Sequence, residues 1–284
     1  MKIITSQKCW RYGTEGHPES PSRVRDTYKY LESLGFGFTE PVECKKQDIL
    51  RAHTERLYSE VESGDFYDGD TPAYPGILSH CLLSAGAAIM AAEVAVKSPG
   101  KETAFSLMRP PGHHAGRDSL GGFCYFNNIA IAVKYLLAHS LTRSIAILDI
   151  DCHHGNGTQD IFLSDKKVIF VSLHQSPLYP GTGLKSENNC LNFPLPPGTD
   201  EKKYLETLET ALGKIIEFKP NVLGVSAGFD TYEKDPITRM GLKKETYKKI
   251  TKMISQTATP RFAVLEGGYS EDLSECIHNF LSEF

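Results

Sequence analysis

The stretch LDIDCHHGNG, residues 148–157, places two carboxylates and two imidazoles at the end of an apolar run. Asp149, Asp151 and His153 are spaced by two, so on an extended segment their side chains point to the same side. Carboxylates this close together repel each other unless a cation lies between them. Two carboxylates and an imidazole suit a divalent metal, and a catalytic zinc site takes three protein ligands and leaves one position open. The alternative is a hydrogen-bonded Asp–His strand end that binds nothing.

Three further apolar runs end in groups that such a site would use. VLGVSAGFD ends in Asp230, a natural third metal ligand. FAVLEGGY carries Tyr269 after two glycines, which permit a tight turn. LMRPPGHHAG places His113 and His114 after a rigid Pro-Pro. One packed and one exposed histidine is the alternative for that pair, and the second His-His pair in DCHHG argues against it.

Together these residues predict a hydrolytic site. A metal ion held by Asp151, His153 and Asp230 would lower the pKa of its bound water towards neutrality. A histidine is the natural base because its intrinsic pKa is about 6.5. Tyr269 can donate a hydrogen bond to the oxyanion that forms when water attacks a carbonyl. Asp149 can orient a histidine from behind the metal.

Aromatic residues cluster in two glycine-containing segments. GGFCYFNN contains Phe123, Tyr125 and Phe126, and SPLYPGTG contains Tyr179. Two of these rings could wall a narrow channel for an alkyl chain. The alternative is that they belong to the core near turns.

The elements that must position these residues are short, continuous apolar runs, as expected for strands buried on both faces. The predicted strands are residues 2–6, 103–108, 144–150, 167–173, 222–228 and 261–267. Helices are predicted between them over residues 80–96, 127–141, 200–218 and 242–256. This alternation predicts a single α/β domain over residues 1–284, with a mostly parallel sheet and helices on both faces.

Five long segments between these elements are predicted to be irregular. They are residues 9–22, 62–76, 109–126, 174–199 and 229–241. Long ordered loops often carry function, and the candidate metal ligands, histidines and tyrosine lie in these segments or at strand ends.

The composition excludes several classes of protein. The chain has 31 Lys and Arg residues against 35 Asp and Glu, a net charge of −4. This near balance gives no excess of basic residues with which to bind nucleic acid or an anionic membrane. The beginning MKIITSQKCW lacks the apolar segment of a secretory signal, and no run approaches the ~20 apolar residues of a membrane span. Seven scattered cysteines without a CxxC predict reduced thiols and a cytoplasmic location.

Six blocks of the sequence resemble motifs of the zinc-dependent histone deacetylase and acetylpolyamine amidohydrolase family. They are RPPGHHA, GFCYFNN, LDIDCHHGNGT, VSLHQ followed by YPGTG, SAGFDTYEKDP and LEGGY. HPESPSR at residues 17–23 fits as well, and the blocks follow the family order as far as residue 269. The resemblance implies the arginase/deacetylase α/β fold and hydrolysis of an N-acetyl amide on a long amine side chain.

The resemblance also implies a role for each matching residue. The implied zinc ligands are Asp151, His153 and Asp230. The implied tandem active-site histidines are His113 and His114, with His114 nearer the general-base role. Tyr269 matches the tyrosine that polarises the substrate carbonyl.

Further matches concern the surroundings of the site. The implied channel residues are Phe123 and Tyr179, with Gly122 beside them and Asp70 holding the substrate backbone. A structural monovalent cation such as K⁺ is implied at Asp149, Asp151, His153, Ser172 and Leu173. Arg23 matches a buried arginine behind the active site.

Three positions narrow the subtype. Asn156, where some members have Asp, resembles the class II and bacterial or archaeal branch. Tyr269 is kept where a weakly active subgroup has His, which favours full deacetylase chemistry. Ile237 stands where a polyamine-selective subgroup has an acidic gatekeeper. We therefore expect acyl-lysine in proteins as the substrate, with small acetylated amines such as acetylpolyamines as the alternative.

Two rival functions are weighed against this expectation. An arginase-like ureohydrolase uses two metals and needs more carboxylates, but Cys152 and Gly155 stand where further ligands would sit. A catalytically silent module that binds acetylated ligands would be expected to have lost a zinc ligand or the tyrosine. Both are present in this sequence.

Overall fold

A computed structural model describes all residues from 1 to 284 and contains one eight-stranded sheet. Its strands are β1 (Lys2–Ile4), β2 (Phe38–Thr39), β3 (Ala104–Ser106), β4 (Ile145–Asp149), β5 (Val168–Gln175), β6 (Cys190–Leu195), β7 (Val222–Ala227) and β8 (Arg261–Leu265). Every neighbouring pair is parallel, in the order β2-β1-β3-β8-β7-β4-β5-β6. The expected α/β class is confirmed, and the six predicted strands are present with ends shifted by one or two residues.

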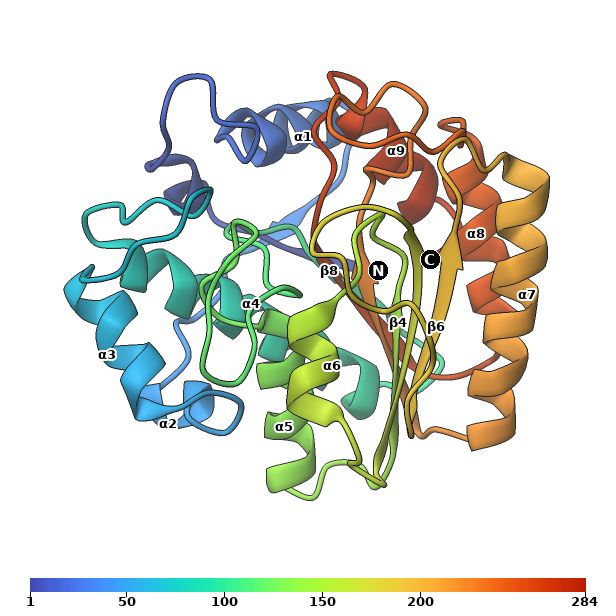
Figure 1. The fold of residues 1–284 in the computed structure, drawn as a ribbon, viewed down its shortest axis with the longest axis horizontal. Coiled ribbons are helices and arrows are strands. Elements are labelled where there is room, and N and C mark those ends of the chain that lie inside the picture. The colour runs from blue at the N-terminus through green and yellow to red at the C-terminus, as the bar shows by residue number, and fades with distance from the viewer.

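Helices cover both faces of the sheet, as predicted. They are α1 (Ser22–Ser33), α2 (Lys46–Ile49), α3 (Glu55–Ser63), α4 (Ile77–Lys97), α5 (Asn128–Ala138), α6 (Asn156–Phe162), α7 (Glu201–Phe218), α8 (Thr246–Ser255) and α9 (Leu273–Leu281), with a 3₁₀ turn at Gln7–Trp10. Helices α4, α5 and α6 lie on one side, and α1, α7, α8 and α9 lie on the other (Figure 1). The buried hydrophobic side chains form one cluster of 74 residues, so the layers share a single core.

Several elements were not predicted, and their sequences explain why. The segment 174–199 is not irregular throughout, because it contains the end of β5 and all of β6. β6 is an edge strand with a proline at position 194, which edges tolerate but which hides a strand in the sequence. The buried face of α1 includes Arg23 and Thr27 beside Val24 and Leu31, so polar residues mask its helical period.

Helix α4 contradicts the expectation that no run approaches membrane-spanning length. By length and composition alone it could cross a membrane, with a mean hydropathy of 1.6. However, 61% of its most apolar 18-residue stretch is buried inside the protein, and α4 packs against α5, β3 and β8. This is the environment of the core helix of an α/β fold, and its many alanines permit the close packing.

Candidate active site

Each of the four central strands of the sheet is followed by residues with ionisable side chains. Because the strands are parallel, their carboxyl ends meet at one edge, where open α/β sheets bind ligands. In the order β3, β8, β7 and β4, the segments that follow carry the His113–His114 pair, Tyr269, Asp230 and Asp151 to His153. Residues that are far apart in the sequence therefore face one another.

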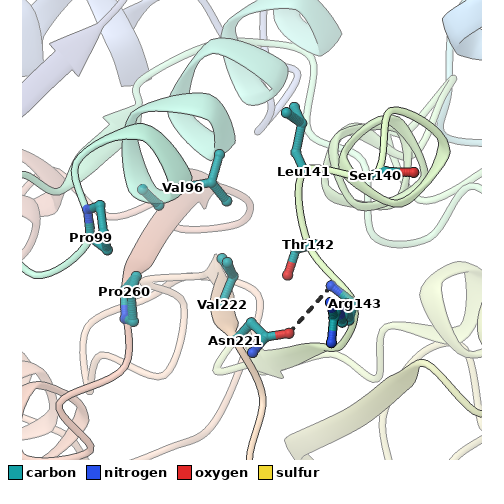
Figure 2. A pocket seen from close by; sticks show the side chains of 10 residues that line it. Val96, Pro99, Ser140, Leu141, Thr142, Arg143, Asn221, Val222 and Pro260 are labelled. Atoms are coloured by element: carbon teal, nitrogen blue, oxygen red, sulfur yellow. Dashed lines mark hydrogen bonds between the residues drawn. The ribbon is translucent and has the colours of Figure 1, made fainter.

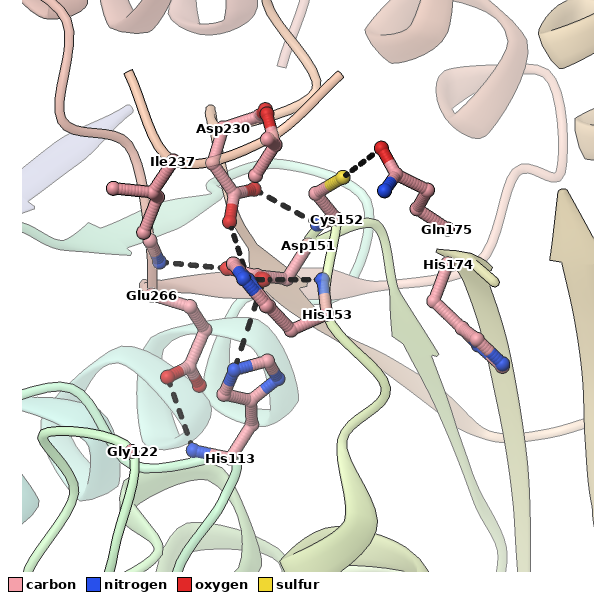
Figure 3. Close-up of polar contacts among 12 residues, drawn as sticks. His113, Gly122, Asp151, Cys152, His153, His174, Gln175, Asp230, Ile237 and Glu266 are labelled. Carbon is pink, nitrogen blue, oxygen red and sulfur yellow. Dashed lines mark hydrogen bonds and ion pairs between the residues drawn. The ribbon is translucent and has the colours of Figure 1, made fainter. Parts of the chain in front are cut away.

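Asp151, His153 and Asp230 form a compact group of potential metal ligands. One ligand atom from each lies within 4.8 Å of the others, and all three side chains are buried. His153 Nδ1 lies 2.8 Å from Asp230 Oδ2 and 3.1 Å from Asp151 Oδ1 (Figure 3). Asp230 Oδ2 nevertheless accepts no hydrogen bond, although it is buried. A buried carboxylate oxygen without a donor and beside another ligand atom is what a metal site requires, so this donor set fits zinc.

Backbone contacts hold the two carboxylates in place. Asp230 Oδ1 accepts a hydrogen bond from Cys152 N at 2.8 Å, and Asp151 Oδ2 accepts one from Gly267 N at 2.7 Å. A Cβ atom at Gly267 would lie 2.6 Å from Asp151 Oδ2, which is closer than real side chains allow. A glycine after β8 is therefore needed for this close approach.

The site carries an excess of buried negative charge. Five carboxyl groups are almost fully buried there, namely Asp149, Asp151, Asp230, Asp235 and Glu266. Burial and the neighbouring Asp151 raise the pKa of Asp230 to about 7. Although burial lowers it, the adjoining carboxylates raise the pKa of His153 to about 10. A bound cation would offset this surplus of buried negative charge.

The His113–His114 pair lies against this group from the loop after β3. His113 Nδ1 is 3.0 Å from Asp149 Oδ2, and burial is outweighed by Asp149 and Asp151, which raise the pKa of His113 well above its ordinary value. Burial and the two nearby histidines lower the pKa of His114 well below its ordinary value. His114 Nδ1 bonds Asn156 Oδ1 at 2.7 Å, which assigns the proton to Nδ1 and leaves Nε2 a free acceptor.

Tyr269 approaches the site from the loop after β8. Its backbone N–H donates to Asp235 Oδ2 at 2.8 Å, and the Arg23 guanidinium carbon lies 4.7 Å from its ring centre. Arg23 is buried and donates to Gly268 O at 2.7 Å and to Glu266 O, which fixes the same loop. Burial raises the pKa of Tyr269 well above its ordinary value, so its hydroxyl keeps its proton. That hydroxyl makes no hydrogen bond within the chain and is free to donate.

Phe123 and Tyr179 lie beside Tyr269 and His114. The Phe123 ring centre is 5.8 Å from that of Tyr269, and the Tyr179 ring centre is 5.0 Å from that of His114. Phe123 has φ 68°, an uncommon conformation for a residue with a side chain. In contrast, Tyr125 and Phe126 are buried in the core, as the alternative interpretation expected for aromatics near turns.

The backbone around Phe123 is tied to a neighbouring loop that includes Asp70. Gly122 N donates to Asp70 Oδ1 at 3.2 Å, and Phe123 N donates to Thr71 Oγ1 at 2.9 Å. A Cβ at Gly122 would collide with the His114 ring, so only glycine fits against that histidine.

Ile237 lies on the loop after β7 and is 36% exposed. Its N–H donates to Asp235 Oδ1 at 3.0 Å, while the other oxygen of that carboxylate accepts from Tyr269 N. The loop that carries Ile237 and the loop that carries Tyr269 are thus coupled through one side chain.

The remaining predicted cation residues lie on β4 and β5 directly behind the metal group. Asp149 and Ser172 are register partners, and Leu173 follows Ser172. All three are fully buried. Ser172 Oγ bonds His174 Nδ1 at 2.9 Å, and Asp149 Oδ1 accepts from Asp151 N at 3.1 Å.

Sequence reasoning missed two buried carboxylates of the site, Asp235 and Glu266. Asp235 supports Tyr269 N, and Glu266 accepts from the backbone of the His113 loop. The signal for Glu266 was available, because it is an acid at the end of an apolar strand, like Asp149 and Asp230. Its partners could be identified only in the folded chain.

A separate hollow of about 370 Å³ lies at the opposite edge of the sheet, near the beginnings of β7 and β8 (Figure 2). Its lining includes Val96, Leu141, Asn221 and Pro260, and Asn221 Oδ1 accepts from Arg143 N. It contains no acid, histidine or cysteine, so it lacks the chemistry gathered at the carboxyl edge.

Comparisons with known proteins agree with this geometry. The model of the histone deacetylase domain matches residues 17–284. A probable deacetylase of Archaeoglobus fulgidus is 42% identical over 277 residues, covering 89% of this chain and 77% of the relative. An acetylpolyamine amidohydrolase of Mycoplana ramosa is 37% identical, covering 78% of this chain and 67% of the relative.

Solved structures show the same fold. The HDA15 HD domain superposes with a TM-score of 0.93 at 28% identity, covering 99% of this chain and 90% of that one. An acetylpolyamine aminohydrolase from Burkholderia pseudomallei superposes with a TM-score of 0.88 at 26% identity, covering 100% of this chain and 98% of that one.

Proposed function

Because the chain belongs to the histone deacetylase family and is a hydrolase of acetyl amides, we propose that it uses one zinc ion to remove acetyl groups from acyl-lysine side chains in proteins. The observation that carries the proposal is the meeting of three kinds of group at one edge of the sheet. A three-ligand metal set, a histidine with a free nitrogen and a tyrosine hydroxyl without a partner converge there.

Asp151, His153 and Asp230 would hold the zinc ion. When bound, zinc supplies a Lewis acid that lowers the pKa of water and polarises the amide carbonyl. The fourth position would stay open, since the chain presents three ligands here.

His114 would move the proton of the reaction. Its Nε2 is an acceptor because Nδ1–H is committed to Asn156, and its lowered pKa keeps it neutral. It can take the proton of the attacking water and return it to the leaving amine nitrogen, so that water and amide give acetate and amine. His113, held by Asp149, would keep a positive charge beside the reacting groups.

Tyr269 would donate its hydroxyl proton in a hydrogen bond to the oxygen that becomes negative as water adds to the carbonyl. Its high pKa and its fixed backbone support this role. Phe123 and Tyr179 would enclose the alkyl chain and exclude water from it.

The preference for acyl-lysine is supported by Ile237. It is an apolar, partly exposed side chain on the loop coupled to Tyr269, and it offers no carboxylate for a second amine. An uncharged side chain at this position suits the peptide that surrounds an acylated lysine.

Small acetylated amines are the second candidate, because a different observation favours them. Asp68 Oδ2 and the Tyr179 hydroxyl lie 3.4 and 3.5 Å from the position of a Cβ on Gly121, so they face the same space. Asp70, half-buried beside them, adds a second carboxylate. These groups would attract a cationic amine, and relatives of this chain are named acetylpolyamine amidohydrolase.

A monovalent cation such as K⁺ at Asp149, Asp151, His153, Ser172 and Leu173 is part of the proposal. It is supported by the buried Asp149 carboxylate and by the surplus of acids around it. We also propose a cytoplasmic location, which the seven buried, unpaired cysteines support.

A turnover panel tests the proposed function. It comprises acetyl-lysine peptides, longer acyl-lysine peptides, acetylputrescine and acetylspermidine, each with and without a chelator. We expect kcat/KM for the acetyl-lysine peptide to exceed that for acetylputrescine, and the chelator to abolish both. A higher kcat/KM for acetylputrescine would identify small acetylated amines as the substrates. In that case Ile237→Glu should increase the preference for acetylputrescine.

The same panel addresses the rival functions. A silent binding module would bind the peptides and release no acetate. A two-metal ureohydrolase would instead release urea from arginine or agmatine, so those two compounds complete the panel.

A further inference from the structure

Glu266 is a buried acid at the end of β8 that the proposed reaction does not use. Its side chain is fully buried and makes no contact with solvent. Burial raises its pKa to about 7, so the fold keeps an acid here at a cost. The contacts of its two oxygens show what it does.

Both oxygens of the Glu266 carboxylate accept hydrogen bonds. Oε2 accepts from Gly112 N at 2.7 Å and from His113 N at 3.1 Å (Figure 3). Oε1 accepts from Ser226 Oγ on β7 at 3.0 Å. One side chain therefore joins β8 and β7 to the loop after β3.

Two of these donors belong to the backbone that presents the histidine pair. The Gly112–His113 backbone has no strand partner of its own, since β3 ends at Ser106. With that backbone fixed, His113 Nδ1 stays 3.0 Å from Asp149, and the His114 ring stays 4.0 Å from the His113 ring.

We propose that Glu266 is a positioning residue that sets the placement of His113 and His114 through the reach of its carboxylate across to the β3 loop. This inference rests on the proposed function, because it concerns the same reaction. A 1 Å displacement of a catalytic group can cost roughly 10²-fold in rate, so the loss of these hydrogen bonds should have a measurable effect.

The competing explanation is that Glu266 acts through its charge on His113. Two substitutions separate the explanations. Glu266→Gln keeps the reach and removes the charge, because its amide oxygen can accept both N–H groups and its NH₂ can donate to Ser226. Glu266→Asp keeps the charge and shortens the reach by one methylene.

Both variants are compared with the wild type in the acetate-release assay, with zinc content measured. We expect Glu266→Gln to keep kcat within about threefold and Glu266→Asp to lose about 10–100-fold, with KM changed by less than about threefold and zinc retained. The exposed Glu209→Asp serves as the matched control and should behave as the wild type.

Two outcomes would overturn the proposal. If Glu266→Asp is the more active variant, the charge matters rather than the reach. If both variants equal the wild type, Glu266 positions nothing.

A readout independent of turnover keeps this test separate from the proposed function. The proton shared by His113 Nδ1 and Asp149 should give a low-field NMR signal that is kept in Glu266→Gln and shifted in Glu266→Asp. An unchanged signal in both variants also contradicts the positioning role, even if the wild type hydrolyses none of the substrates.

Discussion

Two tandem histidine pairs follow two of the four central strands, His113–His114 after β3 and His153–His154 after β4. In each pair the first histidine contacts buried carboxylates and has a raised pKa. In each pair the second histidine has a lowered pKa, because burial and neighbouring histidines disfavour its charged form. By residue type the two pairs are alike, but the sequence analysis already separates them, because it predicts His153 as a metal ligand and the resemblance implies the acid–base role for His113 and His114.

The pairs differ in the free nitrogen of the second histidine. His114 bonds Asn156 through Nδ1 and keeps Nε2 free. His154 uses both nitrogens, with Thr182 Oγ1 at 2.8 Å and Gln159 Oε1 at 3.0 Å. Thr182 belongs to the loop that carries Tyr179, so His154 anchors that loop and has no nitrogen left for a proton in transit.

The largest effect should come from the loss of a metal ligand beside His153. Asp230→Ala removes a ligand and leaves Asp151 and His153 without their common partner, so we expect loss of stoichiometric zinc and of all turnover. Metal analysis after dialysis measures this directly. The exposed Asp26→Ala is the control, and unchanged zinc in Asp230→Ala would refute the ligand assignment.

The second-largest effect should come from His114, and it tests whether the two histidine pairs differ in proton transfer. His114→Ala should lower kcat by about 10²–10⁴-fold while zinc and substrate binding persist, because it removes the proton acceptor. Inhibitor titration and metal analysis check binding and zinc. If binding fails and the chemical step of bound substrate is normal, His114 is not the base.

Tyr269→Phe sharpens the comparison by leaving both histidine pairs intact. It removes one donor to the developing oxyanion, so kcat should fall by about 10²–10³-fold with zinc content unchanged. Steady-state kinetics measure the loss. A near-normal kcat would show that the carbonyl is polarised without this hydroxyl.

His154→Ala is the matched partner of His114→Ala and should have the smallest effect on rate. We expect kcat within about tenfold of the wild type and a loss of about 1–3 kcal/mol in the free energy of unfolding, because two buried hydrogen bonds disappear. A kcat loss as large as that of His114→Ala would mean that both pairs transfer protons.

The same variant should change the pH dependence of stability. Burial and the neighbouring His174 lower the pKa of His154 to about 3, against an ordinary value of 6.5. The unfolded chain therefore binds a proton that the folded chain refuses, and stability present above pH 6.5 is lost as the pH falls towards 3. Urea unfolding of His154→Ala between pH 7 and 5 should show a slope smaller by up to about 1.4 kcal/mol per pH unit.

The sequence supports prediction of the strands and the metal group for a physical reason. Strands buried on both faces are continuous apolar runs, so an acid at the end of such a run, like Asp149 or Asp230, stands out as a candidate site residue. The spacing of Asp151 and His153 then follows from the period of an extended chain. These are local signals.

The remaining features depend on contacts between distant residues. Nothing local distinguishes His154 from His114, since their partners Thr182 and Asn156 lie 28 and 42 residues away. Glu266 could be noticed as a buried acid, but its hydrogen bond to His113 spans 153 residues. β6 was missed because edge strands tolerate the proline and asparagine that it contains.

The central claim is that one metal ion, held by Asp151, His153 and Asp230, supports hydrolysis of an acetyl amide. Zinc titration of the metal-free protein, with acetate release from an acetyl-lysine peptide and from acetylputrescine as the readout, tests it most directly. We predict no activity without metal and full activity on the preferred substrate at one equivalent of zinc. Activity in the metal-free protein, or a requirement for two equivalents, would contradict the account.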